Sequence, residues 1–506
     1  MEQHALNNPE TQRHPLIELF AIAAPTIATM ATYTVMQFTD SLMVAHIQPP
    51  SPSYVAAQSN AGMWTWIAMC FPVALVGIVN TFVAQHLGRG EPRKGAAYAW
   101  AGLWFSLAFW LLIVPCVAIF PWIFEHFLGH EGQTLEIEIG YARICLLGSV
   151  FTMLARSVAQ FFFGLHRATV PLIGGLSAIT VNVAANFLLI FGYLGFPAMG
   201  VNGAAVGTVI GAFTEFAVLM FIFLGPTHNT RFGTRASWRP SLRPILDILR
   251  LGWPSGTMMI NEMICWGYMM TALMPRAGKA AGDSADVHNV VGWIALKYMH
   301  LAFMPSVGMS IALTAIVGKF MGMGRPDLAA KRTWLGLSVT MGYMGLCGLL
   351  MVVFREEAIN NFITKGYDPA IKQRMIEIGG WVLTIAAVFQ IFDALGMSMN
   401  GALRGAGDTL IPGLAFIVLS WTILIGGGHL MVALRPDLGS IGPWIAAATY
   451  IIVLGVVLLV RFLGGKWKTM SVIEPHFDTS VISGLPGEGL ALVSDGAAEV
   501  TSGSPG

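Results

Sequence analysis

The sequence predicts an all-α, polytopic membrane protein with about 12 transmembrane helices in two pseudo-symmetric six-helix bundles. Three observations favour this class. Of the 506 residues, 55% are hydrophobic and only 11% are charged, whereas soluble globular proteins carry about 25% charged residues. Apolar stretches of roughly 20 residues, the length needed to cross a bilayer core, recur along the chain. The second half also repeats short patterns of the first half in the same order.

The apolar stretches are separated by polar residues, glycine and proline, and they define the expected helices. The predicted spans cover residues 16–46, 56–86, 97–121, 138–163, 169–193, 201–224, 246–275, 288–319, 333–354, 377–402, 411–433 and 441–463. Each stretch is continuously apolar, which excludes the short alternating strands of a membrane β-barrel.

Basic residues gather in every second connection between these spans. They are Arg89, Arg93, Lys94, Arg167, Arg231, Arg235, Arg239, Arg243, Arg325, Lys331, Arg332, Arg404, Lys466 and Lys468. Because Lys and Arg are enriched in cytoplasmic loops, we expect both termini in the cytoplasm and the chain in the plasma membrane, which is the inner membrane of a bacterium.

The longest basic connection divides the chain into two sets of six spans. We predict a cytoplasmic N-terminal segment at 1–15, a first bundle at 16–224, a basic cytoplasmic linker at 225–245 and a second bundle at 246–465. Residues 466–506 are rich in Ser, Gly, Asp and Glu without periodicity, which predicts a disordered cytoplasmic tail.

Short patterns of the first bundle recur about 230–240 residues later. The pairs are LIELFAIAAPT with ILDILRLGWPS, LGRGEPRKGAAYAW with MGMGRPDLAAKRTW, QFFFGLHRATVP with GALRGAGDTLIP, and AMGVNGAAVGT with SIGPWIAAATY. Two parallel repeats predict two bundles around an axis along the membrane normal, with a cavity between them that opens alternately to each side. This is the architecture of a transporter.

Among the acids inside predicted spans, the leading candidates are Asp40, Glu262 and Asp393. An acid within the membrane is unfavourable and marks a functional site. A carboxylate that faces a cavity binds Na⁺ through its oxygens or takes up a proton, and either event neutralises it for the return stroke. The alternative is an acid that completes a polar network or pairs with a base. We favour a cation-coupling role for all three.

Lys297 lies inside the eighth span. It either pairs with Glu262 or Asp393 in the place of a bound cation, or extends to the outer interface. Pairing would argue against simple Na⁺ binding and favour either proton coupling or an anionic group on the substrate. Both alternatives stay open.

Other polar residues and two prolines have weaker functional indications. Glu215 is a candidate modulating acid in the sixth span, and a hydrogen bond inside the bundle is its alternative. Tyr33 and Tyr298 are candidates for lining the substrate path. Pro25 and Pro254 each interrupt a helix and act either as hinges or as static kinks.

No enzyme motif occurs in the sequence. It lacks a P-loop, GxSxG, HExxH and DDxxD. We expect no enzyme activity and no ATP-driven transport by this chain, so that an ion gradient must supply the energy. A net charge of +1 without a run of Lys and Arg argues against nucleic-acid binding.

Four segments resemble the multidrug and toxic compound extrusion (MATE) family, in its NorM-like branch. They are FTDSLMVAHI at 38–47, VNVAANFLLIFGYLGFPAMGVNGAAVGT at 181–208, LGWPSGTMMINE at 251–262 and FDALGMSMNGALRGAGDTLIP at 392–412. The resemblance covers roughly residues 15–465. It implies an exporter of varied, often cationic amphipathic compounds, driven by inward flow of Na⁺ or H⁺.

The resemblance also implies roles for single residues. Acids that match Glu262 and Asp393 line the cation site of the second bundle, where Na⁺ is the expected metal if one binds. The acid that matches Asp40 serves the first bundle, and Asn182 and Asn186 match an asparagine pair in helix 5. Lys297 departs from the family, which usually has an uncharged polar residue there.

Two other functions stay open at this point. A flippase for lipid-linked oligosaccharides has a related fold and would favour a cavity lined by Arg and Lys. A membrane receptor or scaffold without transport would leave the acids in both bundles unexplained. The expected partners are small organic substrates and membrane lipid. We expect a monomer that needs no cofactor besides the coupling ion.

Overall fold

The computed structural model describes residues 14–49, 52–127, 131–283, 285–361, 368–470 and 472–473. Within these ranges the chain is almost entirely helical and has no β-strand. Eleven of the described helices are long and apolar enough to cross a membrane. A twelfth, α11, is 27 residues long, but Pro254, Asn261 and Glu262 make it more polar. The prediction of an all-α protein with about 12 spans is confirmed.

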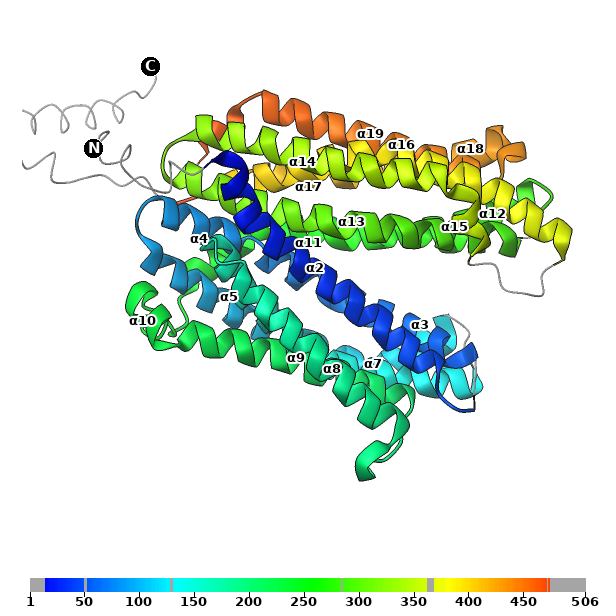
Figure 1. Cartoon of the computed structure of the whole chain (residues 1–506), viewed down its shortest axis with the longest axis horizontal. Coiled ribbons are helices and arrows are strands. Elements are labelled where there is room, and N and C mark those ends of the chain that lie inside the picture. The colour runs from blue at the N-terminus through cyan, green and yellow to red at the C-terminus, as the bar shows by residue number, and fades with distance from the viewer. Residues whose placement is uncertain are drawn as a thin grey trace, which may run out of the picture. The chain divides into compact units, whose positions relative to one another are not determined.

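The helices follow one another in the predicted order (Figure 1). In the first half they are α2 (Pro15–Ala45), α3 (Pro52–Val76), α4 (Val79–Gly88), α5 (Pro92–Ile113), α6 (Phe120–Trp122), α7 (Gly132–Gly164), α8 (Thr169–Phe191) and α9 (Val201–Leu224). In the second half they are α11 (Leu242–Tyr268), α12 (Met274–Ala280), α13 (Ala285–Gly322), α14 (Pro326–Val353), α15 (Arg355–Asn360), α16 (Pro369–Ala406), α17 (Leu410–Leu419), α18 (Gly428–Leu434) and α19 (Ile441–Leu463).

A short helix, α10 (Pro226–Phe232), lies in the connection that the sequence assigns to the linker. Short 3₁₀ segments cover Val114–Ala118, Tyr193–Gly195, Pro436–Leu438 and Lys466–Thr469. Three π-helical segments are η2 (Ile123–Phe127), η4 (Met269–Leu273) and η5 (Ser420–Gly427). The segment predicted at 1–15 and the tail predicted at 466–506 lie mostly outside the described residues.

Some helices differ from the predicted spans in their bounds. The predicted span 377–402 begins earlier, at Pro369, because a proline suits the first turn and the Asp368 carboxylate accepts a hydrogen bond from the Ala370 N–H at 2.8 Å. The second predicted span divides into α3 and α4. The eleventh is α17, η5 and α18 in succession. Apolar composition therefore located the spans, whereas capping residues and π-turns set their details.

The duplication seen in the sequence recurs in the backbone. At the end of α7, His166 has φ +60°, and the Arg167 N–H donates to Phe162 O at 2.9 Å. At the matching end of α16, Gly407 has φ +97°, and the Asp408 N–H donates to Leu403 O at 2.9 Å. Both helices thus end in the same left-handed turn.

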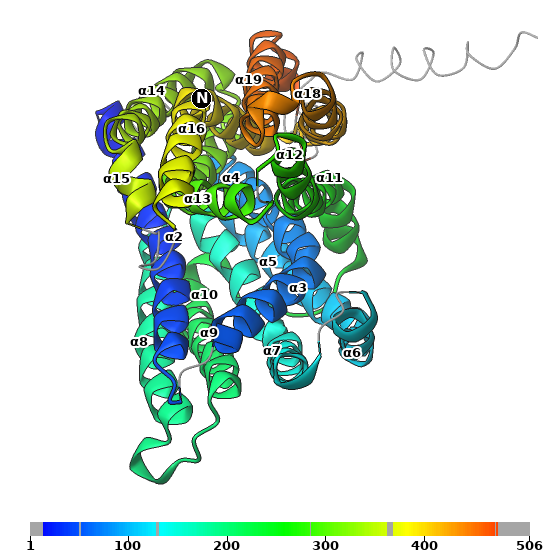
Figure 2. The same ribbon diagram turned by 90° about the vertical axis from the view of Figure 1, so that its right-hand side faces the viewer.

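Two pairs of equivalent spans are buried to the same extent. In the most apolar window of the second span of each half, 72% of residues are buried, and in the fourth span of each half the share is 56%. The pseudo-symmetric pair of bundles is therefore present in the fold. Figure 1 and Figure 2 show the first bundle below the second, with α2 running from beside α14 to beside α8.

The two bundles meet closely where α4 and α13 end. A Cβ on Gly88 would collide with the carbonyl of Lys319, and a Cβ on Gly322 would collide with the carbonyl of Gln85. The repeat makes Gly88 equivalent to Gly322 and Gln85 equivalent to Lys319. Each helix therefore uses a glycine to let the backbone of the other approach.

Polar contacts reinforce this junction, which we call the seam. Hydrogen bonds across it join Asn80 Nδ2 to Ile311 O (3.2 Å), Thr81 Oγ1 to Arg404 O (2.9 Å), Gln85 Nε2 to Gly405 O (3.1 Å) and His166 Nε2 to Ala315 O (3.1 Å). An ion pair also joins Arg332 Nε to Glu18 Oε2 at 2.8 Å, with both side chains largely buried. These residues lie near the ends of helices that the charge pattern assigns to the cytoplasm.

Candidate functional site

The first bundle holds Asp40 beside two asparagines of α8. Asn182 and Asn186 are four residues apart, so that they lie on one face of the helix. Gly207 and Gly211 of α9 lie opposite, and a Cβ on either would press against Asn186 or Asn182. The glycines thus allow α9 to pack directly on the two amides, which are fully buried.

Hydrogen bonds fix the carboxylate of Asp40. Asn186 Nδ2 donates to one oxygen at 2.6 Å, and Thr208 Oγ1 lies 3.2 Å from the other. Asn186 Nδ2 is also 3.5 Å from Asn182 Oδ1. Asp40 is only 5% exposed, and among the described residues no basic side chain pairs with it. The Oδ1 atom of Asn186 is buried without a described partner, so that this cluster has an unused oxygen.

A second polar group lies in the same bundle. The Tyr33 hydroxyl donates to Glu215 Oε1 at 2.6 Å, and the guanidinium of Arg156 lies 3.7 Å from the centre of the Tyr33 ring. Helices α2, α7 and α9 therefore meet at this point. The structure therefore brings the two predicted residues Tyr33 and Glu215 together. They form a group that shares no hydrogen bond with the cluster around Asp40.

The second bundle holds Glu262 of α11 and Asp393 of α16. Both side chains are half-buried and line a cavity of about 30 Å³, whose walls include Phe303, Phe416 and Leu454. The two acids face one cavity, and among the described residues neither forms an ion pair with a base. A cavity of this size suits a water molecule or a bare cation rather than an organic substrate.

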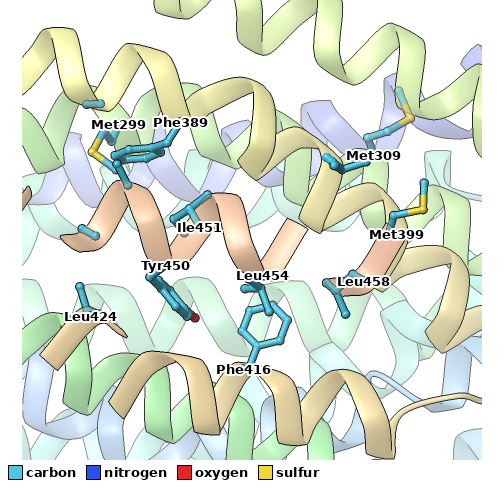
Figure 3. Close-up of a cluster of buried hydrophobic side chains, with 14 of the residues drawn as sticks. Met299, Met309, Phe389, Met399, Phe416, Leu424, Tyr450, Ile451, Leu454 and Leu458 are labelled. Atoms are coloured by element: carbon cyan, nitrogen blue, oxygen red, sulfur yellow. The ribbon is translucent and has the colours of Figure 1, made fainter. Parts of the chain in front are cut away.

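Aromatic and aliphatic side chains of α17 and α19 surround this cavity. Figure 3 shows Phe416 of α17 pointing toward Leu454 and Tyr450 of α19. The Tyr450 side chain is buried, and its hydroxyl has no hydrogen-bond partner among the described residues. The largely apolar walls lower the local dielectric constant, so that an ion here would interact strongly with the carboxylates.

Helix irregularities flank the acids of the second bundle. The π-helical segment η4 follows α11 shortly after Glu262, and the π-helical segment η5 packs against α11. Asn261 joins α11 to η5, because its Nδ2 donates to Ser420 Oγ at 2.8 Å and its Oδ1 accepts from Trp421 Nε1 at 2.8 Å. π-Turns occur frequently at functional sites, and this one holds the helix that carries Glu262.

The remaining predicted residues lie apart from these clusters. The side chain of Lys297 is exposed on α13, and no ion pair with Glu262 or Asp393 is found among the described residues. The Tyr298 hydroxyl donates to Ala358 O at 3.1 Å, which ties α13 to α15. Pro25 and Pro254 lie inside helices that continue past them. The roles proposed for these four residues stay predictions.

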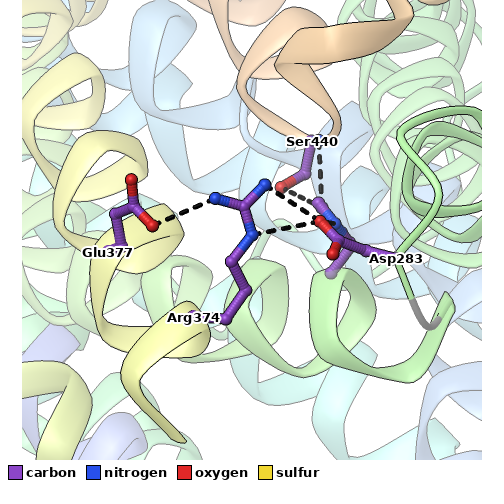
Figure 4. A network of polar contacts seen from close by, with 5 residues as sticks. Asp283, Arg374, Glu377 and Ser440 are labelled. Carbon is purple, nitrogen blue, oxygen red and sulfur yellow. Dashed lines mark hydrogen bonds and ion pairs between the residues drawn. The ribbon is translucent and has the colours of Figure 1, made fainter. Parts of the chain in front are cut away.

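A polar network closes the end of the second bundle away from the seam (Figure 4). Asp283 Oδ2 accepts from His288 Nε2 at 3.1 Å and from Arg374 Nη2 at 3.1 Å, and Arg374 Nη1 also donates to Glu377 at 3.0 Å. The Ser440 N–H donates to His288 Nδ1 at 3.1 Å. The network therefore joins the beginnings of α13, α16 and α19.

Sequence reasoning missed Thr208 and Tyr450. Both end the repeated patterns AMGVNGAAVGT and SIGPWIAAATY, so that the repeat makes them equivalent. Thr208 Oγ1 lies 3.2 Å from Asp40 Oδ2, and Tyr450 is buried on α19 next to Ile451, which lines the cavity of Glu262 and Asp393. A search for hydroxyl residues at equivalent positions of the two repeats would have found them.

A protein-family model, MatE, matches residues 25–188 and 291–426, which together exceed half of the chain. The chain belongs to the MatE family. The two matched segments fall on the two halves of the duplication. The MatE chain is therefore a multi-pass membrane transporter of a multidrug efflux family, and not an enzyme, as the sequence predicts.

The similar curated proteins are named as NorM multidrug resistance proteins. The probable multidrug resistance protein NorM of Thermotoga maritima is 28% identical over 458 residues, which cover 90% of this chain and 94% of the relative. The multidrug resistance protein NorM of Burkholderia vietnamiensis is 27% identical over 479 residues, covering 92% and 96%.

Solved structures share the MatE fold at lower identity. A MOP superfamily transporter from Pyrococcus furiosus is 18% identical with a TM-score of 0.80, over 91% of this chain and 98% of that one. A multidrug resistance MATE family transporter in an outward-facing conformation is 19% identical with a TM-score of 0.78, over the same shares. These likenesses support the arrangement of the helices.

Proposed function

We propose that the protein exports amphipathic, often cationic organic compounds in exchange for Na⁺ or H⁺, by alternating access of its two bundles. Asp40, Glu262 and Asp393 are the coupling residues in this proposal. One observation carries the proposal. Asp40 in the first bundle is buried, Glu262 and Asp393 in the second are half-buried, and none of the three pairs with a basic side chain among the described residues. A purely structural acid would be expected to pair with a base.

The seam supports alternating access. The described hydrogen bonds and the Glu18–Arg332 ion pair between the bundles gather at the ends of α4, α14 and α16. If the basic connections lie in the cytoplasm, as we propose for both termini, this structure is closed on the cytoplasmic side. Opening that side would require these contacts to break, with Pro25 and Pro254 as proposed hinges.

The two acid clusters suit different ways of binding a cation. Around Asp40, amide and hydroxyl oxygens of Asn182, Asn186 and Thr208 add to the carboxylate, which are the ligands that hard cations such as Na⁺ prefer. In the second bundle, Glu262 and Asp393 repel each other unless a proton or a cation neutralises one of them. Either event would allow a cationic substrate and the coupling ion to exchange.

The test is efflux of ethidium from proteoliposomes that contain the purified monomer, with an imposed Na⁺ or pH gradient. Wild-type protein is expected to move the dye under one of the gradients, which identifies the ion. Asp393→Asn is expected to abolish this movement, and Lys297→Ala shows whether that charge sets the choice of ion.

The same assay separates the alternatives. If no gradient drives efflux of any cation tested, the exporter proposal fails. Movement of a fluorescent lipid-linked oligosaccharide between leaflets would then support a flippase, and movement of no compound under any gradient would support a receptor or scaffold.

A further inference from the structure

A groove lies at the end of α9, where the chain turns into α10. Its volume is about 700 Å³, and its walls come from residues 213–228 together with Arg235. The wall on α9 is apolar and aromatic, formed by Phe213, Phe216, Met220 and Phe221. Phe221 is 82% exposed and Phe213 is 49% exposed, so that in a membrane this wall faces lipid rather than protein.

The rim of the groove is basic. Arg235 is held in place because its Nε donates to Leu224 O at 2.8 Å and its backbone N–H donates to Asn229 Oδ1 at 3.0 Å. The terminal nitrogens of this guanidinium have no hydrogen-bond partner among the residues that the structure describes. They are therefore available to an anion at the rim.

His228 lies on the same rim and is backed by another arginine. Arg167 Nη1 donates to His228 Nε2 at 2.8 Å, and the ring packs edge-on against Phe162. Burial lowers the pKa of His228, and the charges of Arg167 and Arg231 lower it further, which keeps the imidazole neutral near pH 7. An anion bound nearby would offset the positive charges of Arg167 and Arg231 and thereby raise the pKa of His228.

The connection that carries the rim is rich in arginine. Residues 225–246 contain Arg231, Arg235, Arg239 and Arg243 without an Asp or Glu, and the next residue, Asp247, accepts a hydrogen bond from the Tyr98 hydroxyl. The nearest acid of α9, Glu215, is buried and accepts the hydrogen bond from Tyr33 inside the bundle. The rim therefore has a positive field over an apolar wall.

Tryptophans indicate the depth of the groove. Trp100 Nε1 donates to Thr234 O at 2.6 Å, and Trp104 Nε1 donates to Trp238 O at 2.9 Å. Tryptophan concentrates at the membrane–water interface. The connection that follows α10 thus lies at headgroup level, with the aromatic wall of α9 beside the acyl chains.

We infer that this groove binds an anionic phospholipid, with an acyl chain along Phe213, Phe216 and Phe221 and the headgroup phosphate at Arg235 beside His228. Juxtamembrane bases attract anionic lipids, and a guanidinium fork matches two phosphate oxygens. The efflux proposed above does not require this site, so that the two proposals stand or fall separately.

The experiment is native mass spectrometry of the full chain in detergent, titrated with phosphatidylglycerol or with phosphatidylcholine of the same acyl chains. Wild-type protein is expected to retain phosphatidylglycerol preferentially. Arg235→Gln is expected to weaken its binding about fivefold or more, the effect of one arginine near an anionic surface. Ala217→Phe, which fills the groove without changing charge, is expected to weaken it as well.

Arg239→Gln is the matched control, because Arg239 has the same charge in the same connection but does not line the groove. Equal losses in Arg239→Gln and Arg235→Gln would overturn the site in favour of diffuse attraction. Competition by inorganic phosphate or glycerol phosphate would overturn it in favour of a simple anion site. Each variant is first checked for unchanged thermal unfolding, and Arg235→Met, which also removes the charge, replaces Arg235→Gln if the latter unfolds.

A second readout comes from His228. In ¹³C-histidine NMR, with the signal assigned by its loss in His228→Gln, phosphatidylglycerol is expected to raise the pKa of His228, because a nearby phosphate favours the imidazolium. Phosphatidylcholine, with a neutral headgroup overall, is expected to shift it less. An unchanged pKa at saturating phosphatidylglycerol would place the headgroup elsewhere and overturn the assignment.

Discussion

The two bundles hold their acids in different ways, although they arose from one repeated pattern. Asp40 is buried and oriented by an amide and a hydroxyl from two other helices. Glu262 and Asp393 are half-buried and line one cavity of about 30 Å³ together. The two bundles therefore share the arrangement of their helices but differ in their polar groups. The first has one acid oriented by hydrogen bonds, and the second has two acids that face one cavity.

The largest loss of efflux is expected when one acid of the Glu262–Asp393 pair is neutralised. Asp393→Asn leaves Glu262 without the second charge, so that the second bundle no longer binds a coupling cation between two carboxylates. We expect gradient-driven ethidium efflux from proteoliposomes to fall at least about tenfold, as for an intramembrane acid with a functional role. Glu356→Gln, which changes an exposed acid on α15, is the control. Efflux within twofold of wild type would remove Asp393 from the mechanism.

Removing the donor to Asp40 is expected to act first on stability. Asn186→Ala leaves the buried Asp40 carboxylate without its 2.6 Å hydrogen bond, which should destabilise the protein by about 1–3 kcal/mol. Thermal unfolding in detergent measures this loss. The exchange Asp40→Asn with Asn186→Asp keeps one acid and one amide in contact and should recover part of it. If the exchanged protein is less stable than Asn186→Ala, the pair is not a local unit.

Smaller effects are expected from the hydroxyls of Thr208 and Tyr450, which occupy equivalent positions in the two bundles. Thr208→Val removes one donor from Asp40, which keeps its bond to Asn186, so that a loss of about 1 kcal/mol or less is expected. Tyr450→Phe removes a buried hydroxyl on α19, the helix whose Ile451 and Leu454 line the cavity of Glu262 and Asp393. We expect Tyr450→Phe to reduce the initial rate of efflux more than Thr208→Val does. The reverse order would mean that the first bundle limits transport.

The smallest effect concerns the network at the end of the second bundle (Figure 4). Burial acts to raise the pKa of Asp283, but the hydrogen bonds from His288 and Arg374 outweigh burial and hold the pKa below its usual value. An acid with a lowered pKa in the folded state contributes stability above its unfolded pKa and loses it as the pH falls through the folded value.

Asp283→Asn should therefore lower the Tm at pH 7 by roughly 1–2 °C, and the difference should close as the pH falls below about 4. Differential scanning calorimetry at several pH values measures this. Asp437→Asn is the control, because the pair with Arg435 is exposed and contributes little. A difference that persists unchanged in acid would show that the charge of Asp283 is not the cause.

Much of the fold could be predicted from the sequence, because membrane helices need long apolar runs and each expected run lies on a helix. The acids were also found, because a charge among apolar residues is conspicuous. Thr208 and Tyr450 were not, since a hydroxyl in a helix usually bonds its own backbone; Thr208 also donates to Ala204 O at 2.9 Å.

Contacts between the bundles were beyond sequence reasoning. Glu18 and Arg332 are 314 positions apart and lie at polar helix ends, where charged residues are ordinary. Only the packing of α2 against α14 makes them partners and buries them. The close approach at Gly88 and Gly322 was hidden for the same reason, because a glycine near a helix end also suits a turn.

The glycine crossing at the seam has the form of an isologous interface. Gly88 meets Lys319 while Gly322, its counterpart, meets Gln85, the counterpart of Lys319. In a homodimer this reciprocity means that one surface patch recognises its own copy. A half-length chain with such a patch would be self-complementary, so that fusing two copies would preserve the contact and free the remaining surfaces to specialise. The two acid clusters are what such freedom produces within a single polypeptide.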